Sequence, residues 1–134
     1  MNKFIWPVRV YYEDTDGGGV VYHANYLKFM ERARTEWLRS LGFDQTELRY
    51  GPGVLFVVRE VRLKYRKPAC FNDALHVVTE LSSAGRSLLE FGQTILRGEE
   101  TLTEAKVEVV CVDVERFKPV AIPPVIREKL MEIQ

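Results

Sequence analysis

The chain has 134 residues, which is the usual length of a single domain. Its formal net charge is zero, from 19 basic and 19 acidic residues, so it lacks the basic excess of a general nucleic-acid binder. No apolar run approaches the length of a membrane span, and the first residues lack the apolar core of a signal peptide. We therefore expect one domain over residues 1–134 that is cytoplasmic and not inserted in a membrane.

The first two predicted elements are a strand and a long helix. From Phe4 to Tyr12 apolar residues alternate, and Pro7 marks an edge or a bulge because it cannot donate to a ladder. From about His23 to Leu41 apolar residues recur at three- and four-residue steps, which is typical of an amphipathic helix. The stripe expected to be buried consists of Tyr26, Met30, Ala33, Trp37 and Leu41, widened by Leu27, Phe29 and Leu38.

Four further strands and a short helix are predicted after a turn-rich connection from Phe43 to Val54. The strands are expected over Leu55–Arg66, Asp73–Leu81, Ser87–Leu96 and Thr103–Cys111, and the helix after Pro123. Arg59 falls among inward positions, so either a bulge shifts the phase or Arg59 has a buried polar partner; we favour the bulge. Because most connections are hairpins, the sheet should be antiparallel, which indicates an α+β fold.

The stretch from Tyr12 to Tyr26 joins the first strand to the helix and holds the densest group of special residues. It contains Glu13, Asp14 and Asp16, followed by glycines 17–19. Glycines allow positive φ and close approach of a ligand, and a helix start presents free N–H groups. A flexible acidic turn would have a similar composition, but the density of these residues favours a functional site.

This stretch resembles the signature of the 4-hydroxybenzoyl-CoA thioesterase family of hotdog folds. The likeness is closer still to the bacterial YbgC-type acyl-CoA thioesterases, encoded beside the Tol-Pal envelope system, and it covers nearly the whole chain. The residues that carry it are Asp16, Gly19, Val20–Tyr26, Val8–Asp16, Glu31–Glu36, Cys111–Asp113 and Lys118–Pro119. The resemblance implies a hotdog fold, in which a curled five-stranded antiparallel sheet wraps around one long central helix.

Hydrolysis of a thioester needs an attacking group or a base for water, and a donor where negative charge develops on oxygen. In the family that this chain resembles, the aspartate that matches Asp16 is catalytic, as nucleophile or as general base. The backbone N–H that matches His23 polarises the carbonyl there, while the His23 side chain could contact substrate, assist proton transfer or only occupy the helix start. Gly19 and Tyr22 are candidate substrate contacts, with Tyr22 as a wall of the acyl pocket.

Two other acids compete with Asp16, and a separate turn is expected to bind the nucleotide. Alternation that places Tyr12 inward makes Glu13 outward and solvated, while Asp14 is expected to cap the loop. The turn Gly85-Arg86-Ser87 corresponds in the family to a loop that meets the nucleotide of coenzyme A. Four further cations are candidates for binding the phosphates of coenzyme A: Arg62, Lys64, Arg66 and Lys67. The same alternating charges would also be expected on a strand face exposed to solvent.

The resemblance also bears on partners. It implies an acyl-CoA substrate, or an acyl carrier protein in its place, and no metal or cofactor. An exposed edge strand favours self-association, and we expect a homotetramer built from dimers whose active site borrows residues from a neighbour. Cys70 and Cys111 are expected to be reduced. Two alternatives remain: a hotdog hydratase or dehydratase, and a non-catalytic acyl-binding scaffold of the envelope machinery.

Overall fold

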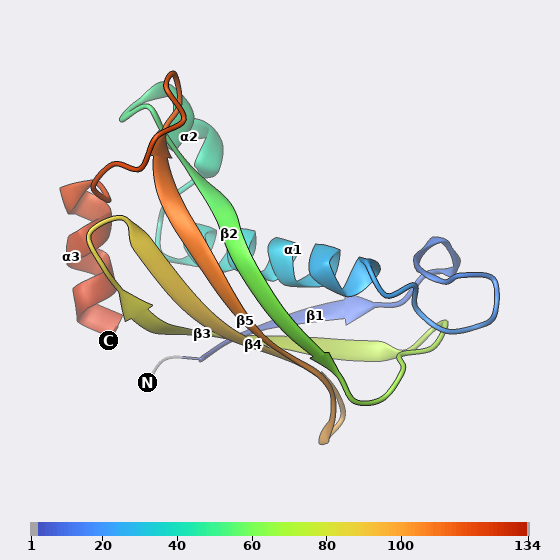
Figure 1. Cartoon of the computed structure of the whole chain (residues 1–134). Helices are drawn as coiled ribbons and strands as arrows, with labels where there is room; N and C mark the ends of the chain where they lie inside the picture. Colours follow the sequence, from blue (N-terminus) through green and yellow to red (C-terminus); the bar gives the residue numbers. More distant parts are fainter. Residues whose placement is uncertain (1–2, 134) are drawn as a thin grey trace.

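The computed structural model describes residues 3–133 and shows a curled sheet with a long helix lying along its concave side (Figure 1). This is the α+β arrangement predicted for a hotdog fold, with five antiparallel strands. The elements are β1 (Lys3–Arg9), the short 3-10 helix η1 (Tyr12–Asp14), α1 (Asn25–Ser40), α2 (Gln45–Tyr50), β2 (Val54–Tyr65), β3 (Ala74–Ala84), β4 (Leu88–Arg97), β5 (Glu100–Asp113) and α3 (Pro124–Ile133).

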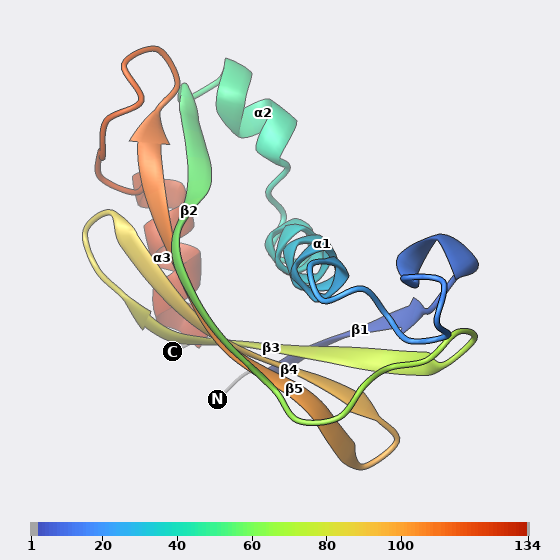
Figure 2. The ribbon, with the colours of Figure 1, turned by 45° about the vertical axis from the view of Figure 1, so that its right-hand side comes forward.

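The strand order across the sheet is β1-β3-β4-β5-β2. Only β3–β4 and β4–β5 are hairpin neighbours, because β2 pairs with β5, the last strand, instead of with β3. The two edges of the sheet are therefore β1, which contains Pro7, and β2. The connection between β2 and β3 has to cross from one edge toward the other, and it passes the N-terminal end of α1 (Figure 2).

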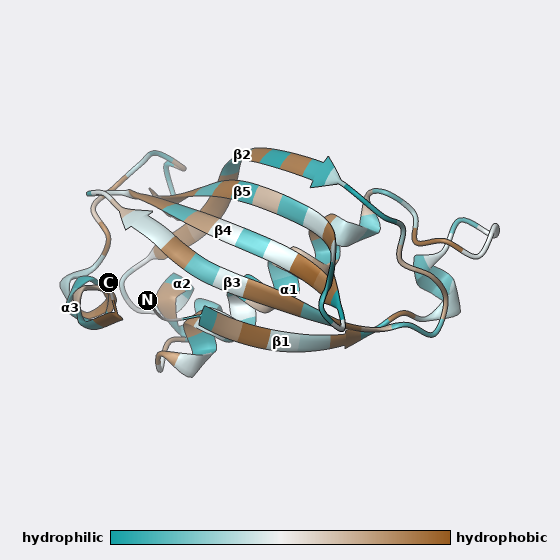
Figure 3. Cartoon of the chain, turned by 90° about the horizontal axis from the view of Figure 1, so that it is seen from below, coloured by the Kyte–Doolittle hydropathy of each residue, from teal (hydrophilic) through white to brown (hydrophobic). Residues whose placement is uncertain are grey.

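The core lies between α1 and the concave face of the sheet. Phe29, Met30 and Ala33 are fully buried, and inward residues of the strands such as Leu75 and Val77 meet them. Removing such side chains from water stabilises the fold by about 1.5–3 kcal/mol each for the larger ones. Along the strands hydrophilic and hydrophobic residues alternate in Figure 3, as expected when one side of each strand faces the core.

Several details differ from the sequence prediction. Tyr12 does not face the core, because the strand ends at Arg9 and Tyr12 lies 72% exposed in η1. Leu27, expected to widen the buried stripe, is 40% exposed. The connection predicted as irregular contains α2, whose first turn is capped by the Asp44 side chain.

Arg59 confirms the preferred alternative of a bulge. The register between β2 and β5 shifts between Val58 and Glu60, which turns Arg59 to the outside. There its guanidinium lies 2.7 Å from the Glu108 carboxylate. No helix in the described part of the chain is long and apolar enough to cross a membrane.

Candidate active site

The loop between β1 and α1, blue in Figure 1, is organised by the buried carboxylate of Asp14. One oxygen of that carboxylate accepts the Tyr11 backbone N–H at 2.8 Å, and the other accepts the Asn25 side-chain amide at 3.0 Å. The Asp14 carbonyl also accepts the Tyr22 N–H at 2.9 Å. Asp14 thus ties the first half of the loop to the start of α1, which confirms its predicted capping role.

Asp16 lies two residues later at the tip of a small exposed hairpin. Its backbone N–H donates to the Val20 carbonyl at 3.1 Å, and its Oδ1 accepts the Gly18 N–H at 2.8 Å. The turn between them needs glycine at positions 17 and 19, whose φ angles are +91° and +92°. Within residues 3–133, Oδ2 of Asp16 accepts no hydrogen bond, so one carboxylate oxygen is free to meet a ligand.

His23 precedes α1 by two residues, because the helix begins at Asn25 and not at His23 as predicted. The His23 ring is exposed and packs beside the Tyr22 ring at 4.5 Å. The Tyr22 carbonyl accepts the Asn25 N–H at 2.8 Å, which makes this the first hydrogen-bonded turn of the helix. In the part of the chain that the structure describes, the backbone N–H groups of His23 and Ala24 have no acceptor, so they can serve an incoming anion.

The connection between β2 and β3 lies against this loop. The Ala69 carbonyl accepts the Val21 N–H at 2.8 Å, and the Ala69 N–H donates to the Tyr26 hydroxyl at 3.0 Å. The Tyr65 hydroxyl donates to the His23 carbonyl at 2.6 Å. The open pocket beside these contacts is lined by Val21, His23, Tyr26, Tyr65, Arg66, Lys67 and Pro68. Tyr22 is not part of this lining, so its role as an acyl-pocket wall stays a prediction.

A network of ion pairs holds the same connection in place. Arg97 pairs with Asp73 at 2.7 Å and with Glu100 at 2.8 Å, and Lys67 pairs with Glu100 at 2.6 Å. Hydrogen bonds from Lys67 and then from Arg97 hold the pKa of Glu100 below its ordinary value. Three members of the predicted row of cations are therefore paired with acids of the sheet: Arg62 with Glu60, Arg66 with Glu104 and Lys67 with Glu100.

The predicted nucleotide turn Gly85-Arg86-Ser87 lies at the other end of the molecule, beside α3 (Figure 1). Its carbonyls are held by α3 and by the segment before it: Arg127 donates to those of Gly85 and Arg86, and the Ile122 N–H donates to that of Arg86 at 2.9 Å. The eleven residues of β3 separate this turn from the connection beside Asp16. At ~3.3 Å a residue that strand is about 33 Å long, so Arg86 and Asp16 of one chain cannot share a ligand's reacting end.

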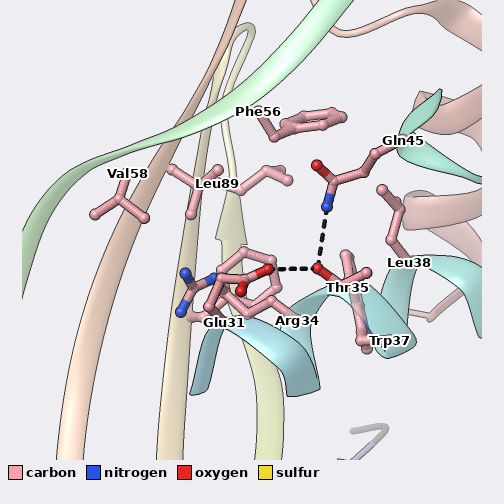
Figure 4. Close-up of a pocket in the computed structure, with 11 residues that line it drawn as sticks. Glu31, Arg34, Thr35, Trp37, Leu38, Gln45, Phe56, Val58 and Leu89 are labelled. Carbon is pink, nitrogen blue, oxygen red and sulfur yellow. Dashed lines mark hydrogen bonds between the residues drawn. The ribbon is translucent and has the colours of Figure 1, made fainter. Parts of the chain in front are cut away.

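A second pocket lies between α1, α2 and the β2 side of the sheet (Figure 4). Its floor is apolar, and on its rim Thr35 links Glu31 and Gln45 by hydrogen bonds of 2.9 and 3.3 Å. Arg34 also lines it; burial lowers the pKa of this guanidinium, whose Nη1 donates to the Gln93 side chain at 2.9 Å. Nine residues of helix, about 13 Å, separate Arg34 from Asn25, so this pocket lies apart from the helix start.

The thiols and the acids offer no metal centre within residues 3–133. No group of three or more His, Cys, Asp or Glu side chains is gathered there. Cys70 and Cys111 are both free, and burial raises the pKa of the Cys111 thiol to about 11, which keeps it protonated at neutral pH.

The sequence profile of the Thioesterase-like superfamily matches residues 10–130, which include the whole loop, the connection and the nucleotide turn. The chain belongs to this superfamily. It is 53% identical over 121 residues to the acyl-CoA thioester hydrolase YbgC of Escherichia coli, covering 90% of each chain. It is 49% identical over 122 residues to the acyl-CoA thioesterase YbgC of Haemophilus influenzae, covering 91% of this chain and 90% of the relative.

A solved structure gives the same result for the fold. The DHNA-CoA thioesterase of Staphylococcus aureus superposes with a TM-score of 0.93 at 25% identity, covering all of this chain and 92% of that one. The likeness to a thioesterase family read from the loop and the helix is thereby confirmed. The sequence analysis did not single out Tyr65, which lines the open pocket with His23, because the alternation of β2 gives no sign that its last residue reaches the start of α1.

Proposed function

We propose that this chain hydrolyses acyl-CoA thioesters to a free acid and coenzyme A, with Asp16 as nucleophile or general base. The proposal rests on one observation: among residues 3–133, a single loop holds both a carboxylate oxygen of Asp16 without a hydrogen-bond donor and, at the start of α1, backbone N–H groups without an acceptor. The superfamily membership and the names of the YbgC relatives support the reaction type.

The chemistry divides between the carboxylate and the helix start. As a base, Asp16 takes a proton from water while the oxygen of that water adds to the thioester carbonyl carbon. As a nucleophile, Asp16 adds to that carbon itself, and water then cleaves the resulting anhydride. In both routes negative charge develops on the carbonyl oxygen, where the His23 N–H stabilises it. The C–S bond then breaks, before water enters in the nucleophilic route, and the departing thiolate of coenzyme A becomes the thiol by taking the proton that the water gives up.

The substrate-binding residues point to more than one copy of the chain. Gly19, Tyr22 and His23 share the loop of Asp16, whereas Gly85, Arg86 and Ser87 lie at the opposite end. If that turn binds the nucleotide, it does so in the site of a neighbouring copy. A homo-oligomer, for which the exposed edge strands β1 and β2 offer unpaired backbone groups, would bring the two ends together.

The test of the proposal is release of free thiol from short, long and aromatic acyl-CoAs by the wild type and by Asp16→Asn. Asparagine has nearly the same shape as aspartate but is a poor base and nucleophile, so kcat should fall by about a hundredfold or more. The oligomer size and the affinity for acyl-CoA should stay close to normal. Glu13→Gln, on an exposed side chain of the same loop, is the control and should cost much less.

Two results would contradict the assignment. Near-normal turnover by Asp16→Asn, with activity abolished by Glu13→Gln or by a His23 substitution, would move the catalytic role to another residue. A change in the alkene of an unsaturated acyl-CoA without thiol release would show a hydratase or dehydratase, and binding without any turnover would show an acyl-binding scaffold.

A further inference from the structure

Tyr65 is the last residue of β2, yet its hydroxyl reaches the start of α1. It donates to the His23 carbonyl at 2.6 Å, across 42 positions of the sequence. Tyr65 is 46% exposed and lines the open pocket together with His23. The contact therefore lies on the wall of this open pocket, next to the helix-start half of the candidate site; Asp16 itself does not line the pocket.

The contact acts on the turn that holds the free N–H groups. Two peptide units flank His23: the Tyr22 carbonyl accepts the Asn25 N–H at 2.8 Å, and the His23 carbonyl accepts the Tyr65 hydroxyl. A trans peptide is planar, so its C=O and N–H point in opposite directions and fixing one fixes the other. Tyr65 thus sets the direction of the Ala24 N–H, and the Asn25 bond sets that of the His23 N–H.

We propose that Tyr65 is a positioning residue for thioester hydrolysis: it holds the peptide between His23 and Ala24 so that the Ala24 N–H faces the developing oxyanion as a second donor beside the His23 N–H. This inference rests on the proposed function. A hydrogen bond to a carbonyl also polarises its peptide and strengthens the N–H on the other side as a donor. Preorganised donors of this kind stabilise the transition state because they need no reorientation during the reaction.

The surroundings of Tyr65 keep the hydroxyl in place and protonated. Its ring meets the buried Tyr26 ring edge-on, with centroids 5.2 Å apart and planes at 74°. Desolvation, and after it the neighbouring Tyr26, raise the pKa of the Tyr65 phenol, so at neutral pH it is a donor. The ion pairs of Arg66 with Glu104 and of Lys67 with Glu100 fix the chain directly after it.

The experiment compares Tyr65→Phe with Ser40→Ala in steady-state hydrolysis of acyl-CoA and in thermal unfolding. Tyr65→Phe keeps the ring contact and removes only the donor, so kcat should fall by about three- to tenfold, less than for loss of an oxyanion donor itself. KM and the unfolding midpoint should not change. Ser40→Ala is the matched control, because its hydroxyl also donates to a backbone carbonyl, that of Trp37 at 2.6 Å, but at the far end of α1; it should leave kcat unchanged.

Three results would overturn the inference: a wild-type kcat in Tyr65→Phe, a raised KM with kcat unchanged, or a loss of activity that only follows a loss of folded protein. Asp16→Asn in the same assay separates this inference from the proposed function. If Asp16→Asn is inactive and Tyr65→Phe is normal, only the role of Tyr65 fails. If Asp16→Asn turns over normally, the chemistry lies elsewhere and both proposals fail.

Discussion

Asp14 and Asp16 are only two positions apart, but their surroundings differ. The Asp14 side chain is buried and both of its oxygens accept hydrogen bonds from the protein. The Asp16 side chain is exposed, and among residues 3–133 only its Oδ1 is hydrogen-bonded, by the Gly18 N–H. A carboxylate whose oxygens are all satisfied stabilises a loop, whereas one with a free oxygen remains available to a ligand.

Two buried threonines give a matched test of what a hydroxyl contributes. Thr79 and Thr103 are both fully buried, but the Thr79 hydroxyl accepts the Gln93 side-chain N–H at 2.9 Å, whereas that of Thr103 has no partner among residues 3–133. Valine has almost the shape of threonine without the hydroxyl. Thr79→Val should lower the free energy of unfolding by about 1–3 kcal/mol, because a buried donor of Gln93 is left unpaired.

Thr103→Val should leave the free energy of unfolding unchanged or raise it by up to about 1 kcal/mol, because no hydrogen bond is lost. Urea unfolding of the two variants beside the wild type measures both effects. Equal losses in the two variants would mean that Thr103 is also hydrogen-bonded, through a water molecule. In Thr79→Val the loss of stability should arise at Gln93, whose side-chain amide keeps its hydrogen bond to the Met30 carbonyl of α1 at 3.0 Å but loses the one to Thr79.

Helix α2 is short and depends on its cap. The Asp44 side chain accepts the Thr46 N–H at 2.8 Å and the Glu47 N–H at 3.4 Å. These bonds, that of Thr46 first, hold the pKa of Asp44 below its ordinary value of 3.8. A carboxylate with a lowered folded-state pKa contributes stability that is present above its unfolded pKa and is lost as the pH falls through the folded value.

The protection of the α2 amides from hydrogen exchange should therefore fall as the pH is lowered through and below 3.8, the ordinary pKa of this carboxyl. Asp44→Ser keeps a capping oxygen but cannot titrate, so its α2 protection should depend less on pH over that range. Hydrogen-exchange mass spectrometry, with rates corrected for the intrinsic pH dependence, makes the comparison. Parallel loss of protection in both proteins would mean that Asp44 does not control α2.

The two ends of the molecule carry different parts of the proposed site. Asp16 lies at one end and Arg86 at the other, with β3, about 33 Å long, between the two ends. Each subunit can therefore contribute its carboxylate to one site and its Arg86 to another. This arrangement predicts that the homo-oligomer, and not a single chain, binds acyl-CoA with full affinity.

Mixed oligomers of Asp16→Asn and Arg86→Ala subunits test this arrangement. Arg86→Ala alone should raise KM for acyl-CoA with little change in kcat, and thioesters that lack the nucleotide should be hydrolysed as by the wild type. Refolded together, the two variants should form some sites with both wild-type residues and exceed the summed activity of the separate variants at low substrate. Additive activities, or light scattering that reports a fully active monomer, would contradict a shared site.

The spacing of apolar residues was enough to locate the helices and strands in which that spacing repeats regularly. The stripe of α1 and the inward residues of β3 follow from spacing alone, and Asp16 with its glycines could be recognised as a candidate site on one loop. The bulge at Arg59 also followed, because a charge on an inward phase needs an explanation that a bulge supplies.

Tertiary structure alone decided which distant segments meet. Alternation in β2 shows which residues face inward, but not that β2 pairs with β5 or that Tyr65 reaches His23. It also could not show that Arg86 lies far from Asp16, because that depends on the length and direction of β3 within the sheet. A period of two or of 3.6 residues is set by the local backbone, whereas partners far apart in the sequence are selected by packing of the whole chain.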